Sequence, residues 1–179
     1  MGSGLAKNLI KNGFLVTGID LKPERLEAFV AMGGKVAQSP AEVGKVSLAV
    51  FVMVMTGDEA KEVILGQDGL MSHLPKGGAV ILSATIKPKE AREIGEAMQG
   101  SGVHLIDTPV SGGFPGAQAG TLTMMAAAPE DVLDRFAPFM DAVSANIHRV
   151  GTNPGDGQTV KACLQSLIGA QFSATFEAA

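Results

Sequence analysis

The sequence has no tryptophan, no tyrosine and a single cysteine among its 179 residues. Because Cys163 has no partner for an internal disulfide, we expect a reducing compartment and therefore a cytoplasmic protein. Lysine and arginine form no cluster, and the formal net charge is −4. A nucleic-acid-binding surface usually needs a basic stripe, so we expect no nucleic-acid partner.

Long apolar runs are also absent. The longest, from Val46 to Met55, is about half as long as a helix that crosses a bilayer, so we expect no membrane partner. The opening Met1-Gly2-Ser3-Gly4 lacks the charged and apolar regions of a signal peptide. Apolar residues nevertheless make up 46% of the chain, which excludes disorder and allows a buried core without a metal or a disulfide.

Helical and extended patterns alternate along the chain. Glycines end the predicted helices, prolines begin several of them, and the predicted strands are short apolar runs such as Leu48–Met55 and Ala79–Ala84. Repeated strand–helix–strand units favour an α/β fold with a doubly wound, mainly parallel sheet covered by helices on both faces. The other elements are predicted at residues 4–12, 24–32, 58–65, 88–98 and 130–142 (helices) and 14–20, 103–108, 121–126 and 146–150 (strands).

The last segment has a different pattern. From Val160 to Phe176 apolar residues recur at a helical period, and the predicted helix reaches Ala179 without a stop signal. A wide apolar face with nothing after it indicates a helix that has lost its packing partner. We therefore expect the chain to be truncated at its C-terminus, and at its N-terminus too, where a helix stands in place of the usual first strand.

Two residues near the start are candidates for binding a dinucleotide. Gly2 has the position of the last glycine in a phosphate-binding turn, although a start rich in glycine and serine is equally typical of an arbitrary N-terminus. Asp20 ends a predicted strand at the spacing of the carboxylate that binds the adenosine ribose and repels a 2′-phosphate, which favours NAD. The alternative is a turn aspartate before Lys22, whose charge also weakens the preference for NAD.

Two further patterns carry chemistry. Ser111, Gly112 and Gly113 follow a predicted strand, where successive backbone N–H groups can hold a carboxylate, although a flexible surface loop would have a similar composition. Lys161 and Gln165 are spaced i, i+4 and share one helical face beside the apolar stripe. A partly desolvated lysine there would have a lowered pKa and suit general acid/base catalysis, whereas the plainer alternative is a surface lysine with a buried stem.

Together these patterns resemble the β-hydroxyacid dehydrogenase family, and most nearly its L-threonate dehydrogenase branch. The similarity covers essentially the whole chain, through the opening residues 1–9, A-T-I-K-P at Ala84 to Pro88, D-T-P-V-S-G-G at Asp107 to Gly113 with its following glycines, and the approach from Gly155 to Lys161. The resemblance implies a Rossmann-like NAD(P)-binding domain over residues 1–152 that lacks its first strand. It also implies that residues 153–179 are the first helix of a C-terminal, all-helical domain.

The resemblance implies an oxidoreductase that transfers a hydride between NAD, with NADP as the alternative, and a small 3-hydroxy acid of the L-threonate, 3-hydroxyisobutyrate or tartronate-semialdehyde type. Lys161 would be catalytic and exchange the proton of the substrate hydroxyl. No metal is implied, and the full-length protein would be a homo-oligomer. The substrate-binding residues would be Ser111, Gly112, Gly113 and Gln165, and the cofactor-binding residues Gly2, Asp20, Met55, Thr56 and Thr85.

The sequence departs from the family pattern at several positions. Leu164 and Gln165 stand where two asparagines are common, and Gln165 is more typical of the L-threonate dehydrogenase branch. Ala84 replaces a serine, and Leu82 stands where an aspartate is common. The absent first strand keeps a second hypothesis open, namely a catalytically inactive dinucleotide-binding or scaffolding protein that retains the fold.

Overall fold

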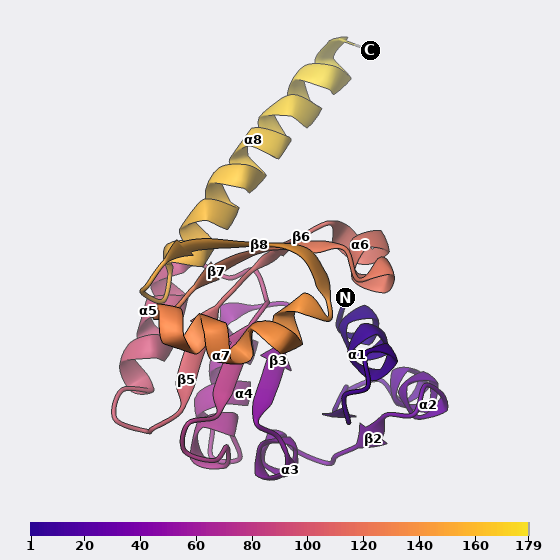
Figure 1. Ribbon diagram of the computed structural model, residues 1–179. Coiled ribbons are helices and arrows are strands. Elements are labelled where there is room, and N and C mark those ends of the chain that lie inside the picture. Colours follow the sequence, from indigo (N-terminus) through magenta and orange to yellow (C-terminus); the bar gives the residue numbers. More distant parts are fainter. Residues whose placement is uncertain (179) are drawn as a thin grey trace.

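The computed structural model describes residues 1–178 and confirms the predicted α/β fold, with helices on both faces of a mostly parallel sheet (Figure 1). The principal sheet has six strands in the order β3-β4-β5-β7-β6, with β8 also paired to β7. β3, β4 and β5 are parallel, whereas β7 runs antiparallel to β5 and β6 and parallel to β8. The strands are β3 (Ala49–Val52), β4 (Ala79–Leu82), β5 (His104–Asp107), β6 (Val110–Ser111), β7 (Leu122–Ala127) and β8 (Ser144–Gly151).

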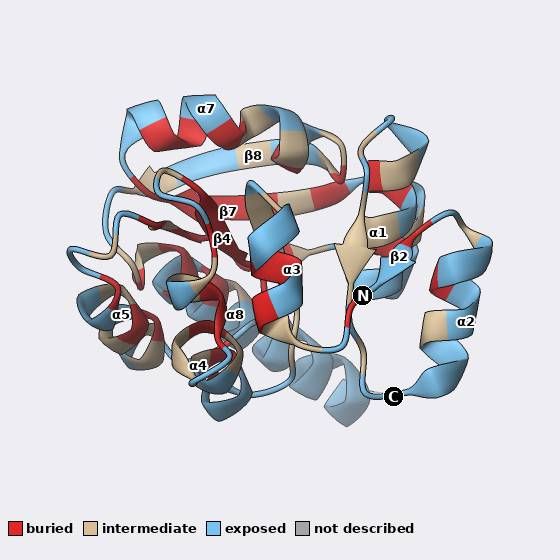
Figure 2. Cartoon of the chain, turned by 90° about the horizontal axis from the view of Figure 1, so that it is seen from below, coloured by how far each residue is buried: buried red, intermediate tan, exposed pale blue. Residues whose placement is uncertain are grey.

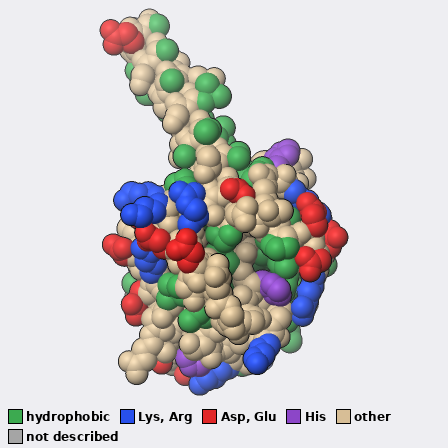
Figure 3. All heavy atoms as spheres, turned by 90° about the vertical axis from the view of Figure 1, so that its left-hand side faces the viewer, with side chains coloured by type: hydrophobic (Ala, Val, Ile, Leu, Met, Phe, Trp, Pro, Cys, Tyr) green, Lys and Arg blue, Asp and Glu red, His purple; other side chains and the backbone are tan. Residues whose placement is uncertain are grey.

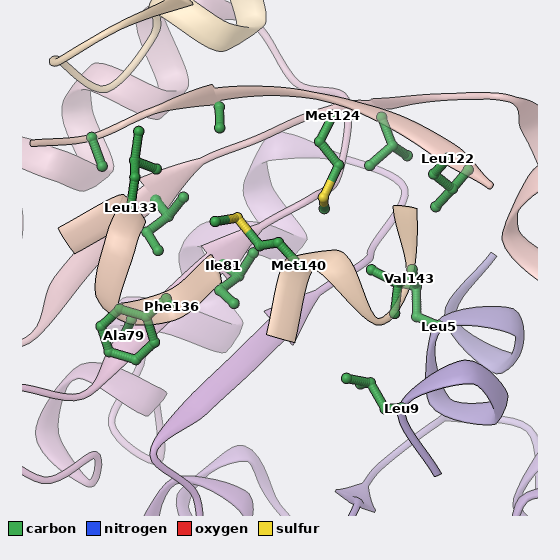
Figure 4. Packing of buried hydrophobic residues seen from close by; sticks show 14 of the residues in the cluster. Leu5, Leu9, Ala79, Ile81, Leu122, Met124, Leu133, Phe136, Met140 and Val143 are labelled. Carbon is green, nitrogen blue, oxygen red and sulfur yellow. The ribbon is translucent and has the colours of Figure 1, made fainter. Parts of the chain in front are cut away.

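Two hydrophobic cores lie on the two faces of this sheet. β4 is buried along its whole length and sends alternate side chains into each core, as the period of two in a strand requires. Ile81 joins Phe136 of α7 (Glu130–Asp141) and Leu5 of α1 (Gly2–Lys11) in the first core (Figure 4). The second core lies under α4 (Gly57–Leu65) and α5 (Pro88–Ala97).

A separate two-stranded sheet joins β1 (Thr17–Gly18) to β2 (Lys35–Val36), with α2 (Pro23–Ala31) between them in sequence. Within residues 1–178 neither β1 nor β2 pairs with a strand of the six-stranded sheet, and the predicted strand over residues 14–20 is much shorter than expected. Only its Thr17–Gly18 segment has partners, and the side chain of Leu15 beside it is 94% exposed.

β3 also differs from the prediction. We expected a strand from Leu48 to Met55 covered on both faces, but only Ala49–Val52 form it and only Val52 is buried. The physical reason is its place at the edge of the six-stranded sheet, where one side has no neighbouring strand. By contrast, all of β4 and most of β5 and β7 are buried, and Figure 2 shows β4 and β7 largely in red.

The prediction missed several short elements. Five were not expected: β2, β6, α3 (Pro40–Val46), the 3₁₀ turn η1 (Leu70–Ser72) and α6 (Gly113–Ala119). The start of α3 does have a signal in the sequence, because the hydroxyl of Ser39 accepts a hydrogen bond from the Glu42 N–H ahead of Pro40. Most of these elements are too short for a periodic pattern to form.

The final helix, α8 (Asp156–Ala178), begins against the sheet and then extends away from it (Figure 1). Its start is buried, but farther along it exposes apolar side chains such as Leu167, Phe172 and Phe176. Figure 3 shows apolar side chains, in green, along the projecting rod. The predicted helix is therefore confirmed as far as Ala178, and Ala179 lies outside the described residues. No helix within residues 1–178 combines the length and the apolar character needed to cross a membrane.

Candidate active site

The candidate site lies where the carboxyl ends of β3, β4 and β5 meet the first turns of α8. Because these three strands are parallel, the residues that follow them gather at one edge of the sheet. Met55 and Thr56 follow β3, Thr85 follows β4, and Asp107 ends β5. α8 contacts β5, β7 and α5 at this edge.

A cleft of about 520 Å³ opens at this edge. Its lining includes Met55, Thr56 and Thr85, together with Ala162 of α8, which is next in the chain to Lys161. The structure thus brings three of the predicted cofactor residues together beside the helix of the predicted catalytic lysine. Two hydroxyls and the 85%-exposed side chain of Met55 suit the amide and the ring face of a nicotinamide, so the residues present fit this half of the cofactor.

Thr56 also has a structural role. Its hydroxyl accepts a hydrogen bond from the Glu59 N–H, and the Glu59 carboxylate accepts from the N–H groups of Met55 and Thr56. This capping box begins α4 and fixes the backbone at the mouth of the cleft. The remaining O–H of Thr56 is free to donate, because the cap uses only the hydroxyl oxygen.

Lys161 is buried at the base of α8, with only 6% of its surface exposed. This burial lowers the pKa of its amine, and within residues 1–178 no carboxylate forms an ion pair with it. The alternative of a surface lysine is therefore wrong. Gln165, one turn farther along α8, is exposed, so its predicted substrate contact stays a prediction.

The segment from Ser111 to Gly120 is the end of β6 followed by the helix α6, and so has more regular structure than the alternative of a surface loop implies. Ser111 is paired with β7, and Gly112 and Gly113 then adopt φ angles of 122° and 60°, which favour glycine strongly. α6 follows and ends at Gly120 in the left-handed conformation. Gly112 and Gly113 are exposed and Ser111 is half-buried, and their contact with a substrate carboxylate stays a prediction.

α6 packs directly against α1. A Cβ atom on Gly4 would lie 2.6 Å from the carbonyl of Ala117, so only glycine allows the two backbones to approach this closely. The side-chain nitrogen of Asn8 is buried between them and donates to the carbonyls of Gly4 (2.9 Å) and Ala117 (2.8 Å). The opening helix and the glycine loop, which we expected to bind different ligands, are thus one packed unit.

Gly2 and Asp20 lie outside the cleft. Gly2 is exposed, and a Cβ atom there would meet nothing within 4 Å, so nothing in the structure requires glycine at this position. The Asp20 carboxylate accepts a hydrogen bond from the Lys22 N–H and forms an ion pair with Arg25 at 3.2 Å. These are the contacts of the alternative turn aspartate, and its cofactor role stays a prediction. Arg25 was missed, although a cation near this carboxylate bears directly on the choice between NAD and NADP.

Asp107 and Gln158 form a buried hydrogen-bonded pair at this edge of the sheet, which the sequence patterns did not predict. Both are fully buried, and the Asp107 carboxylate accepts hydrogen bonds from the N–H groups of Gly155 (2.8 Å) and Gln158 (3.2 Å). Burial raises the pKa of Asp107, while these hydrogen bonds act in the opposite direction. One signal was available, namely a carboxylate at the end of an otherwise apolar strand.

Comparisons with known proteins agree with this geometry. Residues 1–151 match the model of the NAD binding domain of 6-phosphogluconate dehydrogenase. The chain is 35% identical to L-threonate dehydrogenase from Escherichia coli O6:H1, over 99% of this chain and 59% of that protein. It is 34% identical to NAD-dependent L-serine dehydrogenase from Pseudomonas aeruginosa, again over 99% of this chain and 59% of that protein.

A solved structure gives the same result. The crystal structure of 3-hydroxyisobutyrate dehydrogenase from Salmonella typhimurium superposes with a TM-score of 0.92 at 34% identity, over 99% of this chain and 62% of that one. The chain thus spans about 59% of the length of the curated relatives named above. It belongs to the family of the NAD binding domain of 6-phosphogluconate dehydrogenase, and the resemblance to the β-hydroxyacid dehydrogenases is confirmed.

Proposed function

We propose that the chain provides the cofactor-binding domain and the catalytic lysine of a dehydrogenase that transfers a hydride between NAD(P) and a small 3-hydroxy acid. The observation that carries the proposal is the burial of Lys161 next in the chain to Ala162, which lines the same cleft as Met55, Thr56 and Thr85. Bound NAD(P) supplies the hydride acceptor or donor. We assign proton transfer and binding of the substrate carboxylate to residues of this chain.

Lys161 handles the proton. In the direction of alcohol oxidation, its neutral amine accepts the proton of the substrate hydroxyl as the adjacent carbon loses its hydride. Burial lowers the pKa of Lys161, so more of the neutral amine is present near neutral pH than for an ordinary lysine. In the reverse direction, the charged amine returns the proton to the carbonyl oxygen.

The loop at Ser111, Gly112 and Gly113 holds the carboxylate of the substrate. The exposed backbone N–H groups of the two glycines would be donors to the carboxylate, and the serine hydroxyl would add a further donor. L-Threonate, L-serine and 3-hydroxyisobutyrate, which the relatives' names give as substrates, all pair a carboxylate with a nearby hydroxyl. Gln165 would hydrogen-bond a further hydroxyl, which favours a polyhydroxylated acid of the L-threonate type.

The predicted cofactor contacts complete the proposal. The N-terminus of α1 at Gly2 would receive the pyrophosphate, and Asp20 would bind the adenosine ribose and favour NAD. Residues 153–179 would open a helical domain after a cofactor domain over residues 1–152. We further propose a cytoplasmic homo-oligomer, which size-exclusion chromatography and cell fractionation test.

The central experiment measures binding and turnover separately. NADH is titrated against the full-length protein by fluorescence, and oxidation of L-threonate, L-serine and 3-hydroxyisobutyrate is followed by absorbance of the reduced cofactor. Saturable binding with turnover on one of these acids supports the dehydrogenase. Saturable binding without turnover on any of them favours the second candidate, an inactive dinucleotide-binding protein, which the separation of β1–β2 from the main sheet also favours. Absence of NADH binding contradicts both.

A further inference from the structure

Gln158 is a buried amide that joins three separate segments at the site. It lies near the start of α8, and 1% of its surface is exposed. Its side-chain oxygen accepts a hydrogen bond from the Ile86 N–H at 3.0 Å. Its side-chain nitrogen donates to the carbonyl of Ala84 at 3.0 Å and to the Asp107 carboxylate at 2.9 Å. Every hydrogen of this amide therefore has a partner.

Two of these bonds fix the backbone on both sides of Thr85. Ala84 precedes Thr85 and Ile86 follows it, and both are buried while Thr85 itself is exposed and lines the cleft. β4 ends at Leu82, and the amide of Gln158 then takes the place that a neighbouring strand would have beside residues 84–86. The direction in which Thr85 presents its hydroxyl thus depends on Gln158.

The third bond, with its neighbours, fixes the start of α8. The Asp107 carboxylate accepts from the side chain of Gln158 and also from the N–H groups of Gly155 and Gln158. A Cβ atom on Gly157 would lie 2.5 Å from the Met125 carbonyl oxygen, so this turn rests directly on the strand backbone. Rotation and translation of the helix are therefore restrained, and Lys161 lies three residues farther along it.

We propose that Gln158 and Asp107 are positioning residues, which hold the amine of Lys161 and the hydroxyl of Thr85 in one fixed geometry across the cleft. Neither residue touches the reacting atoms. The proposal rests on the proposed function for its kinetic consequence, but its structural part is independent of that function. Glutamate would not replace Gln158, because a second carboxylate would then face Asp107 and the carbonyl of Ala84.

The first test uses Gln158→Met, which keeps the length of the side chain and removes all three hydrogen bonds. Gln99→Met is the matched control, since Gln99 is exposed in the turn after α5. We expect kcat to fall by about 100-fold in Gln158→Met, because small displacements of catalytic groups have effects of this size. The substrate KM should change by less than about threefold, because the glycine loop is intact, and the control should match the wild type.

The second test needs no turnover. We expect the Ile86 N–H to exchange with solvent at least about tenfold faster in Gln158→Met, since its acceptor is gone. Isotope-labelled lysine NMR should place the pKa of Lys161 nearer to the ordinary lysine value in this variant than in the wild type. A wild type without turnover would refute the proposed function. Hydrogen exchange at Ile86 and titration of Lys161 would still test the positioning role in that case. Unchanged exchange and titration in folded Gln158→Met, or a kcat within about threefold of the wild type, would overturn it.

If Gln158→Met does not fold, a pair of variants that moves the carboxylate from residue 107 to residue 158 provides the test. Gln158→Glu alone should be severely impaired, since it places two carboxylates together. Adding Asp107→Asn supplies a donor to the new carboxylate, so the double variant should recover at least about tenfold in kcat and in Ile86 protection over Gln158→Glu. A double variant no better than Gln158→Glu would contradict the proposed contact between residues 107 and 158.

Discussion

The two ends of the proposed cofactor site are built very differently. At the β1–β2 end, strands of two residues pair only with each other, and Asp20 is held by partly exposed contacts with Lys22 and Arg25. At the ends of β4 and β5, the strands are buried. The start of the helix that carries Lys161 is fixed there by buried hydrogen bonds to Asp107. Residues are therefore held most firmly at the end where we propose that a proton is transferred. Variants at this inner end should change kcat, and variants at the outer end should change only cofactor affinity and preference.

The sharpest test of this difference is Lys161→Met. Loss of the amine should lower kcat by about a thousand-fold, within the range for general acid/base catalysis, while NADH affinity stays within a few-fold. Steady-state kinetics and fluorescence titration measure the two quantities. Lys89→Met, at an exposed lysine of α5, is the control and should have wild-type kinetics. Loss of NADH binding in Lys161→Met would show that the inner end serves binding more than chemistry.

Lys161→Met should also stabilise the fold at neutral pH, by about 1 kcal/mol, because a charged amine is then no longer buried without a partner. Burial lowers the pKa of Lys161 below its ordinary value of 10.5, so the charged form is disfavoured in the folded state. The wild type carries the full penalty below the folded pKa and loses it as the pH rises toward the ordinary value. Urea unfolding at several pH values should therefore show the difference from Lys161→Met shrinking as the pH rises. A constant difference would mean that the amine is solvated.

Removing one phenylalanine from the first core and one from the β1–β2 end compares the packing of these two regions. Phe136 is fully buried in the first core, and Phe136→Ala should cost about 4 kcal/mol of unfolding free energy. Phe29 of α2 packs against Gly18 and Gly34 of the outer end and belongs to neither of the two cores, and Phe29→Ala should cost about half as much. Chemical denaturation measures both values. Equal costs would show that the β1–β2 end is as well packed as the first core.

Asn8 tests the connection between α1 and the glycine loop. Asn8→Ala leaves the carbonyls of Gly4 and Ala117 without their shared donor, and we expect a loss of about 2 kcal/mol in stability. The substrate KM should rise more than the NADH dissociation constant, because α6 begins at Gly113 of the proposed substrate loop. Asn12→Ala, at a more exposed asparagine of the same helix end, is the comparison. Equal changes in both constants would mean that α6 is held by other contacts.

The same contrast explains what could be predicted from the sequence. The order of the long elements and the helix of Lys161 were predictable, because each has a periodic apolar pattern within its own residues. β2 and β6 were not, since two residues have no period. The network around Gln158 was not either, because its partners lie 51 to 74 residues away and nothing local marks them. The local helical pattern thus predicts the position of Lys161 on its helix. The contacts that orient this helix form only between distant segments in the folded chain.

Arg25→Ala should have the smallest effect. Its ion pair with Asp20 is exposed, and removing it should change stability by less than about 0.5 kcal/mol. The variant should nevertheless shift cofactor choice, because the carboxylate of Asp20 is then unopposed and the positive charge available to a 2′-phosphate is lost. We expect the ratio of NADP to NAD affinity to fall by about threefold to tenfold, measured by titration with both reduced cofactors. Glu24→Ala on the same helix turn is the control, and an unchanged ratio in Arg25→Ala would place the adenosine ribose away from Asp20.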